Sequence, residues 1–212
     1  VDIQSIATQI SKLRFFISLV VDQKIDTTKV NFGIRPLPNL ETKFVAANTL
    51  IGIDKPDNQL SLYDTPKVKA LETELKKIRH KLFSAKTKDT KLKYRQQDKE
   101  LRNAIAEELI RNGWRNDTAE KLAGWDPYDQ NASSSFFDAE WMFDNKAGFD
   151  LVIGNPPYIG HKGGAKELFQ QLKKTNLGKR FNNERMDIFY YFFHLSIDIT
   201  NSNGIISFIT TN

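Results

Sequence analysis

Cysteine is absent from this 212-residue chain, which also has only two methionines and three histidines. Without cysteine the chain forms no disulfide, offers no thiolate to a metal and has no thiol nucleophile. The three histidines are scattered without the spacing of metal ligands, so no metal site is predicted. No apolar run approaches the roughly 20 residues that span a bilayer, and no signal-peptide pattern is present. These absences favour a reducing compartment, and we expect a cytoplasmic protein with no membrane partner.

Positive charge is concentrated in one stretch of the chain. Residues 66–115 contain 15 Lys and Arg against 7 Asp and Glu, a net charge of +8 out of a total of +5, which leaves −3 for the remainder. Their sparse apolar residues recur at helical spacing, with a break at 86–90, and predict two helices folded as a hairpin. Two interpretations stay open: a solvated hairpin whose lysines give solubility, or a surface that follows a phosphate backbone.

The rest of the chain alternates between short apolar runs and helical patterns. Strands are predicted at 1–3, 43–46, 151–153 and 205–209, the last two as buried strands. A helix with one buried apolar stripe is predicted from Ser5 onward, and an aromatic-rich helix at 187–200. Strands that alternate with helices indicate an α/β fold with a parallel sheet. We expect three parts: residues 1–65, the hairpin insertion at 66–115, and residues 116–212.

The most informative stretch is FDLVIGNPPYIG, residues 149–160. Asn155 offers a side-chain carbonyl on a short stem. Pro156 and Pro157 fix the backbone and donate no N–H, so their carbonyls remain free to accept. Tyr158 adds a flat face for stacking and a polar tip. At the end of a strand, this tetrad is suited to holding a planar amino group between acceptors and a ring.

Other polar side chains are predicted at the same edge of the sheet. Asp2 and Asn48 each follow a predicted strand, and ligands of open parallel sheets bind beyond the carboxyl ends of the strands. Taken singly, each is as well explained as an ordinary turn residue. The segment 159–183 is basic and rich in glycine, which is typical of a substrate-contacting loop. The candidate nucleic-acid contacts in and beside it are Lys162, Lys166, Lys179 and Arg180.

NPPY after DLVIG, with NGIISFITTN about fifty residues later, resembles the conserved block of S-adenosylmethionine-dependent amino-methyltransferases that act on adenine in DNA. The run VDIQSIATQISKLRFFISLVVD, the segment PNLETKFVAANTLIG and the helical insertion are more narrowly similar to the methylase region of type IIG restriction–modification enzymes. The resemblance covers most of the chain. It implies a partial Rossmann-like methyltransferase sheet, S-adenosylmethionine as cofactor and double-stranded DNA as partner, in a bacterial cytoplasm and at the nucleoid.

The resemblance also implies roles for individual residues. Asp2 matches the acidic residue that binds the cofactor ribose, and Asn48 matches a position, often Asp, that contacts the cofactor adenine. The neighbouring Ile3 and Thr49 complete the implied cofactor contacts. The list of implied catalytic residues is Asn155, Pro156, Pro157 and Tyr158: Asn155 and the Pro156 carbonyl accept the hydrogens of the target amino group, and Tyr158 stacks on the flipped base.

The chain departs from the family pattern at Asn48, and also because the glycine-rich cofactor loop that precedes the strand of Asp2 is missing. We therefore expect an internal fragment that is inactive alone and binds the cofactor poorly. Dimerisation and a rearrangement of strands are two ways in which such a sheet would close, and the oligomeric state stays open. The DNA target and the presence of a nuclease domain are likewise not predicted.

Alternative functions also stay open. NPPY occurs in methyltransferases of glutamine side chains in release factors, and related motifs occur in RNA methyltransferases. A different class of protein, a non-catalytic nucleic-acid-binding module built on the hairpin, predicts salt-sensitive binding to any duplex that does not depend on Asn155 or Tyr158.

Overall fold

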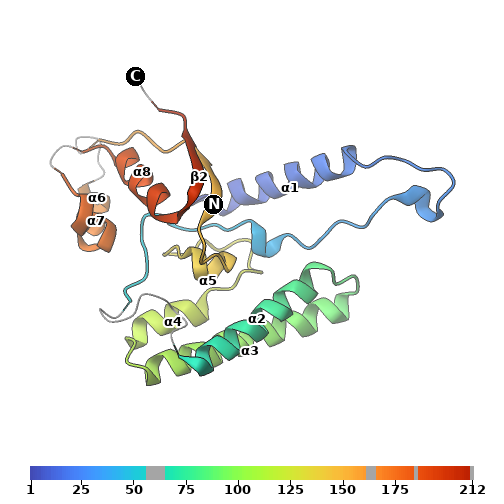
Figure 1. Cartoon of the computed structure of the whole chain (residues 1–212), viewed down its shortest axis with the longest axis horizontal. Coiled ribbons are helices and arrows are strands. Elements are labelled where there is room, and N and C mark those ends of the chain that lie inside the picture. Colours follow the sequence, from blue (N-terminus) through green and yellow to red (C-terminus); the bar gives the residue numbers. More distant parts are fainter. Residues whose placement is uncertain (56–64, 161–165, 184–185, 211–212) are drawn as a thin grey trace. The chain divides into compact units, whose positions relative to one another are not determined.

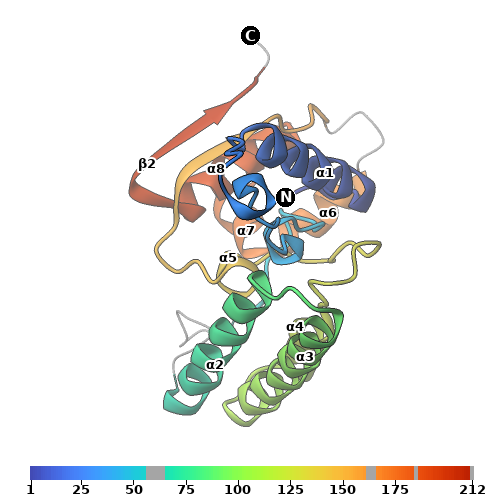
Figure 2. The same cartoon turned by 90° about the vertical axis from the view of Figure 1, so that its right-hand side faces the viewer.

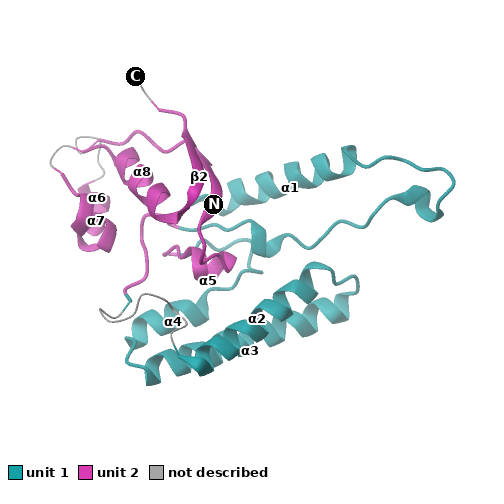
Figure 3. Ribbon diagram, viewed as in Figure 1, with its two compact units in different colours: residues 1–47, 55–134 teal, residues 48–54, 135–212 magenta. Residues whose placement is uncertain are grey.

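The computed structural model describes residues 1–55, 65–160, 166–183 and 186–210 (Figure 1). The chain divides into two compact units, coloured separately in Figure 3. Unit 1 contains residues 1–47 and 55–134, and unit 2 contains residues 48–54 and 135–212. These two units do not test the predicted division into residues 1–65, 66–115 and 116–212, which stays a prediction.

Unit 1 begins with helix α1, Ser5–Val21, as predicted from the spacing of its apolar residues. The prediction that this stripe is buried is wrong. Thr8 is the buried residue of the helix, whereas the stripe residues are between 53% and 75% exposed. No described element of unit 1 covers that side of α1. The helical spacing of its apolar residues therefore marks an apolar face that has no packing partner within the unit. The stripe consists of Ile6, Ile10, Leu13, Ile17, Val20 and Val21.

The predicted strands at 1–3 and 43–46 are not extended strands, and this part of the prediction is wrong. They meet in a single parallel bridge, Asp2 with Ala46, in which the Asp2 N–H donates to the Val45 carbonyl at 3.3 Å. A second isolated parallel bridge joins Ala47 to Ser134. Pairing stops there because the flanking backbone is helical, with α1 on one side and the 3-10 helix η2, Glu41–Lys43, on the other. A further 3-10 helix, η1, spans Val30–Gly33.

The basic segment forms a helical hairpin, as predicted. Helices α2, Pro66–Phe83, and α3, Lys88–Arg111, lie side by side in both views (Figures 1 and 2). They are antiparallel, because Lys67 near the start of α2 pairs with Glu108 near the end of α3 at 2.7 Å. Thr65 and Thr87 cap the two helices through their hydroxyls. Helix α4, Asn116–Gly124, follows and packs on α3.

A buried ionic cluster holds this hairpin together. The Asp98 carboxylate is fully buried and accepts from Arg79 Nε and Arg102 Nε, both at 2.8 Å, and from the Tyr128 hydroxyl at 2.9 Å. Arg102 also donates to the carbonyls of Ala123 and Trp125. Burial and the neighbouring carboxylate raise the pKa of Tyr128 well above its ordinary value, so its hydroxyl keeps its proton and donates. The charges of Arg79, Arg102 and Asp98 are therefore internal to unit 1.

Unit 2 is built on a two-stranded parallel sheet of β1, Phe149–Gly154, and β2, Thr200–Phe208. The register pairs Leu151 with Ile205 and Gly154 with Phe208, with a bulge near the start of the sheet. Gly204 lies at this bulge, where a Cβ atom would approach the Phe149 carbonyl oxygen to 2.7 Å. The two strands confirm an α/β fold with parallel pairing.

One face of this sheet is covered and the other is open. Phe208 meets Phe193 of helix α8, Ile188–Ile199, at a ring distance of 5.0 Å. On the opposite face Leu151, Ile153 and Ile205 are 55%, 69% and 64% exposed. The prediction of fully buried strands is therefore wrong for that face, because no described element of unit 2 packs on it.

Helices α6, Lys166–Lys174, and α7, Asn176–Phe181, pack together beside α8 and close the core of unit 2. Helix α5, Ala139–Phe143, buries Trp141 and Met142. Among the described residues, no helix has the length and apolarity needed to cross a bilayer. The core cluster of unit 2 consists of Leu50, Phe169, Leu172, Leu177, Ile188 and Tyr191.

Candidate active site

The tetrad at 155–158 follows directly after β1. Because β1 and β2 are parallel, their carboxyl ends lie at the same edge, where the Ile209 N–H donates to the Gly154 carbonyl at 3.1 Å. Asn155 and Pro157 are exposed, whereas Pro156 is buried. The side-chain amide of Asn155 is thus accessible at the end of the strand, on a backbone that two prolines make rigid.

Tyr158 is fixed at both ends of its side chain. Its ring contacts the ring of Phe189 edge to face at 5.9 Å, and its hydroxyl donates to the Ile209 carbonyl at 2.6 Å. Despite these contacts the residue is 42% exposed. The Tyr158 ring can therefore stack on a planar ligand, while the Asn155 amide can form hydrogen bonds with the edge of that ligand.

Asp187 is a residue of this region that the sequence analysis did not single out. It caps helix α8, and its Oδ1 accepts both from the Phe189 N–H at 3.2 Å and from the Ile159 N–H at 3.1 Å. The available signal was a carboxylate immediately before an aromatic helix, which indicates an N-cap. That signal predicts the bond to Phe189 and gives no hint of the bond to Ile159.

Asn48 and Thr49 lie in unit 2, half-buried, at a turn closed by the bond from the Ile51 N–H to the Asn48 carbonyl at 3.2 Å. The next residue, Leu50, belongs to the core cluster against which Ile159 packs. The structure therefore brings the segment of Asn48 and the segment after the tetrad to one core.

Asp2 and Ile3 lie in unit 1, and both are exposed. Asp2 Oδ1 accepts from the Gln4 N–H at 2.8 Å, an arrangement that precedes α1. Because these residues belong to a different unit from the tetrad, the predicted convergence of Asp2, Asn48 and the tetrad on one sheet edge stays a prediction.

The predicted nucleic-acid contacts differ in their surroundings. Lys166 and Lys179 are exposed, on α6 and α7. Arg180 pairs with Asp198 through two bonds of 2.8 and 3.0 Å and lies over the Phe181 ring at 4.5 Å. Its charge is therefore already partnered within unit 2. Lys162 lies outside the described residues.

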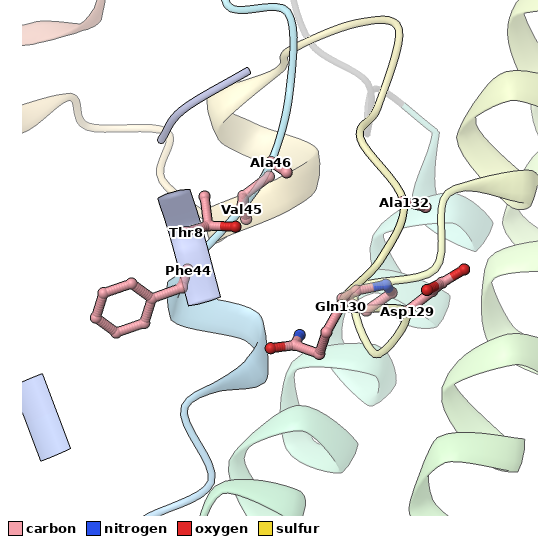
Figure 4. A pocket seen from close by; sticks show the side chains of 8 residues that line it. Thr8, Phe44, Val45, Ala46, Asp129, Gln130 and Ala132 are labelled. Carbon is pink, nitrogen blue, oxygen red and sulfur yellow. The ribbon is translucent and has the colours of Figure 1, made fainter. Parts of the chain in front are cut away.

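Unit 1 has a small surface pocket next to the bridge that Ala46 forms with Asp2 (Figure 4). Neither Asp2 nor any other predicted site residue lines it. In the described part of the chain, no group of His, Asp and Glu side chains is arranged to hold a metal ion. The pocket is lined by Thr8, Phe44, Val45, Ala46, Pro127, Asp129, Gln130 and Ala132.

Unit 2 is thus an α/β unit with a parallel sheet, in which an accessible amide and a tyrosine follow the carboxyl end of a strand, where ligands of open parallel sheets bind. The family model described as Eco57I restriction-modification methylase matches residues 1–212. The chain therefore belongs to the Eco57I restriction-modification methylase family, which confirms the resemblance to restriction–modification methylases. A comparison with curated proteins gives no match.

Proposed function

We propose that this chain is the catalytic region of a DNA methyltransferase that transfers a methyl group from S-adenosylmethionine to N6 of a flipped adenine. The observation that carries the proposal is the exposed Asn155 and Tyr158 at the end of parallel strand β1, in a chain of a restriction–modification methylase family. Such an enzyme acts on double-stranded DNA in the bacterial cytoplasm, at the nucleoid.

The chemistry follows from the properties of the amino group. The lone pair of an adenine amino nitrogen is delocalised into the ring, which makes it a poor nucleophile. The Asn155 side-chain oxygen and the Pro156 carbonyl would each accept one hydrogen of this group and hold it out of the ring plane. The lone pair would then be localised on nitrogen and directed at the methyl donor, with no covalent intermediate. As the nitrogen–methyl bond formed, the methyl–sulfur bond of the donor would break, and the nitrogen would release one of its hydrogens as a proton to water. The absence of cysteine is compatible with such a mechanism.

The residues proposed to hold the cofactor have the appropriate chemistry. Asp2 has an exposed carboxylate with a single backbone donor on Oδ1, which leaves acceptor capacity for ribose hydroxyls. The Asn48 amide, half-buried beside Thr49, can donate to and accept from an adenine edge. Ile3 would supply apolar contact. When bound, S-adenosylmethionine supplies an electrophilic methyl group on a sulfonium.

Tyr158 is proposed to stack on the flipped base and so offset part of the cost of unstacking it. Replacing Tyr158 with alanine should lower methyl transfer about 5- to 150-fold, because stacking of a base on an aromatic side chain contributes about 1–3 kcal/mol. The matched variant Tyr158→Phe keeps the ring and loses only the bond to Ile209. It should stay within about threefold of wild type while losing about 1 kcal/mol of stability. Initial rates measure methyl transfer, and urea unfolding measures stability. Equal rate losses in Tyr158→Ala and Tyr158→Phe would count against a stacking role.

Outside the tetrad, Lys166 and Lys179 are proposed to contact phosphates, because both are exposed. We propose the same role for Lys162. For Arg180, DNA binding would have to compete with the Asp198 carboxylate, so it is the weakest of the four proposed contacts.

The substrate is tested by offering the complete protein three acceptors with radiolabelled S-adenosylmethionine: unmethylated duplex DNA, structured RNA and a translation release factor. We expect incorporation into the duplex alone, and N6-methyladenine as the product after nucleoside digestion and mass spectrometry. Label in the release factor or the RNA would instead support the corresponding alternative. Duplex binding without methyl transfer would support a non-catalytic nucleic-acid-binding module.

A further inference from the structure

The loop that carries the tetrad has few backbone donors with which to hold itself in place. Pro156 and Pro157 have no N–H. The backbone N–H that follows Tyr158 belongs to Ile159, and it is bound by the carboxylate of Asp187 at 3.1 Å. Ile159 also accepts from the Ile188 N–H at 3.1 Å. The backbone that follows Tyr158 is thus attached by two hydrogen bonds to the start of α8, one to its N-cap Asp187 and one to its first residue, Ile188.

These bonds place Asp187 at a junction between three parts of the candidate site. The same Oδ1 atom that holds Ile159 accepts from the Phe189 N–H, and the Phe189 ring contacts the ring of Tyr158. A single carboxylate oxygen therefore holds two backbone N–H groups. One belongs to Ile159, next to Tyr158, and the other to Phe189, whose ring contacts the Tyr158 ring. Ile188, between them, is buried in the core cluster, so this end of α8 is anchored.

We propose that Asp187 is a positioning residue, which holds the Tyr158 ring and the tetrad backbone in the geometry that methyl transfer requires. This inference rests on the proposed function. Asp187 is assigned no contact with the substrate, and it acts through the two N–H groups that it accepts. Because reactive geometry is sensitive to displacements of about 1 Å, loosening this junction should lower turnover by about 100-fold while leaving cofactor binding unchanged.

Three variants of the complete protein separate positioning from charge and from helix capping. Asp187→Ala removes the acceptor. Asp187→Asn removes the charge and keeps a side-chain oxygen able to accept both N–H groups. Thr175→Ala is the matched control, because Thr175 caps α7 in the same unit: its hydroxyl accepts from the Gly178 N–H at 3.0 Å and donates to the Leu172 carbonyl at 2.7 Å, both outside the tetrad loop. It should reproduce the stability loss of a missing cap without the effect on turnover.

The first measurement is hydrogen–deuterium exchange at the Ile159 amide, which needs no activity. Exchange should be accelerated in Asp187→Ala and remain as in wild type in Asp187→Asn and Thr175→Ala. Unchanged exchange in Asp187→Ala would overturn the inference whatever the protein catalyses. An absence of methyl transfer by the wild-type protein, by contrast, would overturn the proposed function.

The second measurement is the kcat and cofactor KM for methyl transfer to unmethylated duplex DNA. Asp187→Ala should lower kcat by about 100-fold with KM within about threefold, and Asp187→Asn should recover most of the rate. Loss of activity in Asp187→Asn equal to that in Asp187→Ala would show that the charge matters and overturn a positioning role. Equal rates in Asp187→Ala and Thr175→Ala would do the same.

Discussion

Alanine in place of Asn155 is expected to lower methyl transfer to duplex DNA by about 10³-fold, because the amino group loses an acceptor that acts as its lone pair localises. The side chain is exposed at the end of β1, and Pro156 and Pro157 keep the backbone beside it rigid. Cofactor binding should be largely unchanged, since Asn155 is assigned to the base. Single-turnover rates and calorimetric titration with S-adenosylmethionine measure the two effects separately.

The matched variant for this experiment is Asn155→Asp, which keeps a side-chain oxygen that can accept a hydrogen bond. Its rate should lie between those of wild type and Asn155→Ala. Turnover by Asn155→Ala at the wild-type rate would refute the assignment of Asn155 as an acceptor. If Asn155→Ala also lost affinity for the cofactor, Asn155 would instead be assigned to cofactor binding.

The second large effect concerns stability. Asp98→Ala should lower the free energy of unfolding of unit 1 by about 3–5 kcal/mol, because it leaves Arg79 and Arg102 without the carboxylate that compensates their buried charge. Arg102 is only 2% exposed, so water does not take the place of the lost partner. The Tyr128 hydroxyl loses its acceptor in the same step. Urea unfolding followed by circular dichroism of the helices measures the change.

The control for this variant is Glu74→Ala in helix α2. Glu74 pairs with Lys77 at 3.4 Å, and both side chains are about half exposed, at 48% and 61%. Exposed pairs of this kind contribute less than about 1 kcal/mol, so this change should be small. If Asp98→Ala were no more destabilising than Glu74→Ala, the cluster would have no special part in holding the hairpin.

The helices of this chain are well predicted by the spacing of apolar residues, because the pattern depends on local geometry. The hairpin at 66–115, the helix from Ser5 and the aromatic helix α8 are all present. Burial is less well predicted, because it depends on which element packs on a given face. The stripe of α1 and the open face of the sheet have the patterns of buried surfaces, and both are exposed.

The location of charged side chains is also less well predicted than the helices. The net charge of the hairpin counts Arg79 and Arg102 toward its basic character and Asp98 against it, whereas the structure has all three in one internal cluster. The spacing of Asp98 and Arg102, four residues apart on a helix, indicates a local pair. The third partner, Arg79, comes from the other helix and depends on the register of the hairpin, which composition does not determine.

For the candidate site, the tetrad and its position after a parallel strand follow from the sequence, because a strand followed by Asn-Pro-Pro-Tyr is a local pattern. The role of Asp187 does not follow, since its bond to Ile159 joins residues 28 positions apart. The cofactor side, Asp2 with Ile3 and Asn48 with Thr49, stays a prediction, and Asp2 lies in a different unit from the tetrad.

The bond between Tyr158 and Ile209 has a consequence for how the molecule assembles. The two residues are 51 positions apart, with helices α6, α7 and α8 between them. Joining distant parts of a chain costs loop-closure entropy, which grows slowly with the length of the loop. The Tyr158 hydroxyl gains this acceptor only after β2 and the residue that follows it have been synthesised. In a shorter nascent chain, the Tyr158 side chain therefore lacks one of the two contacts that hold it in the folded unit.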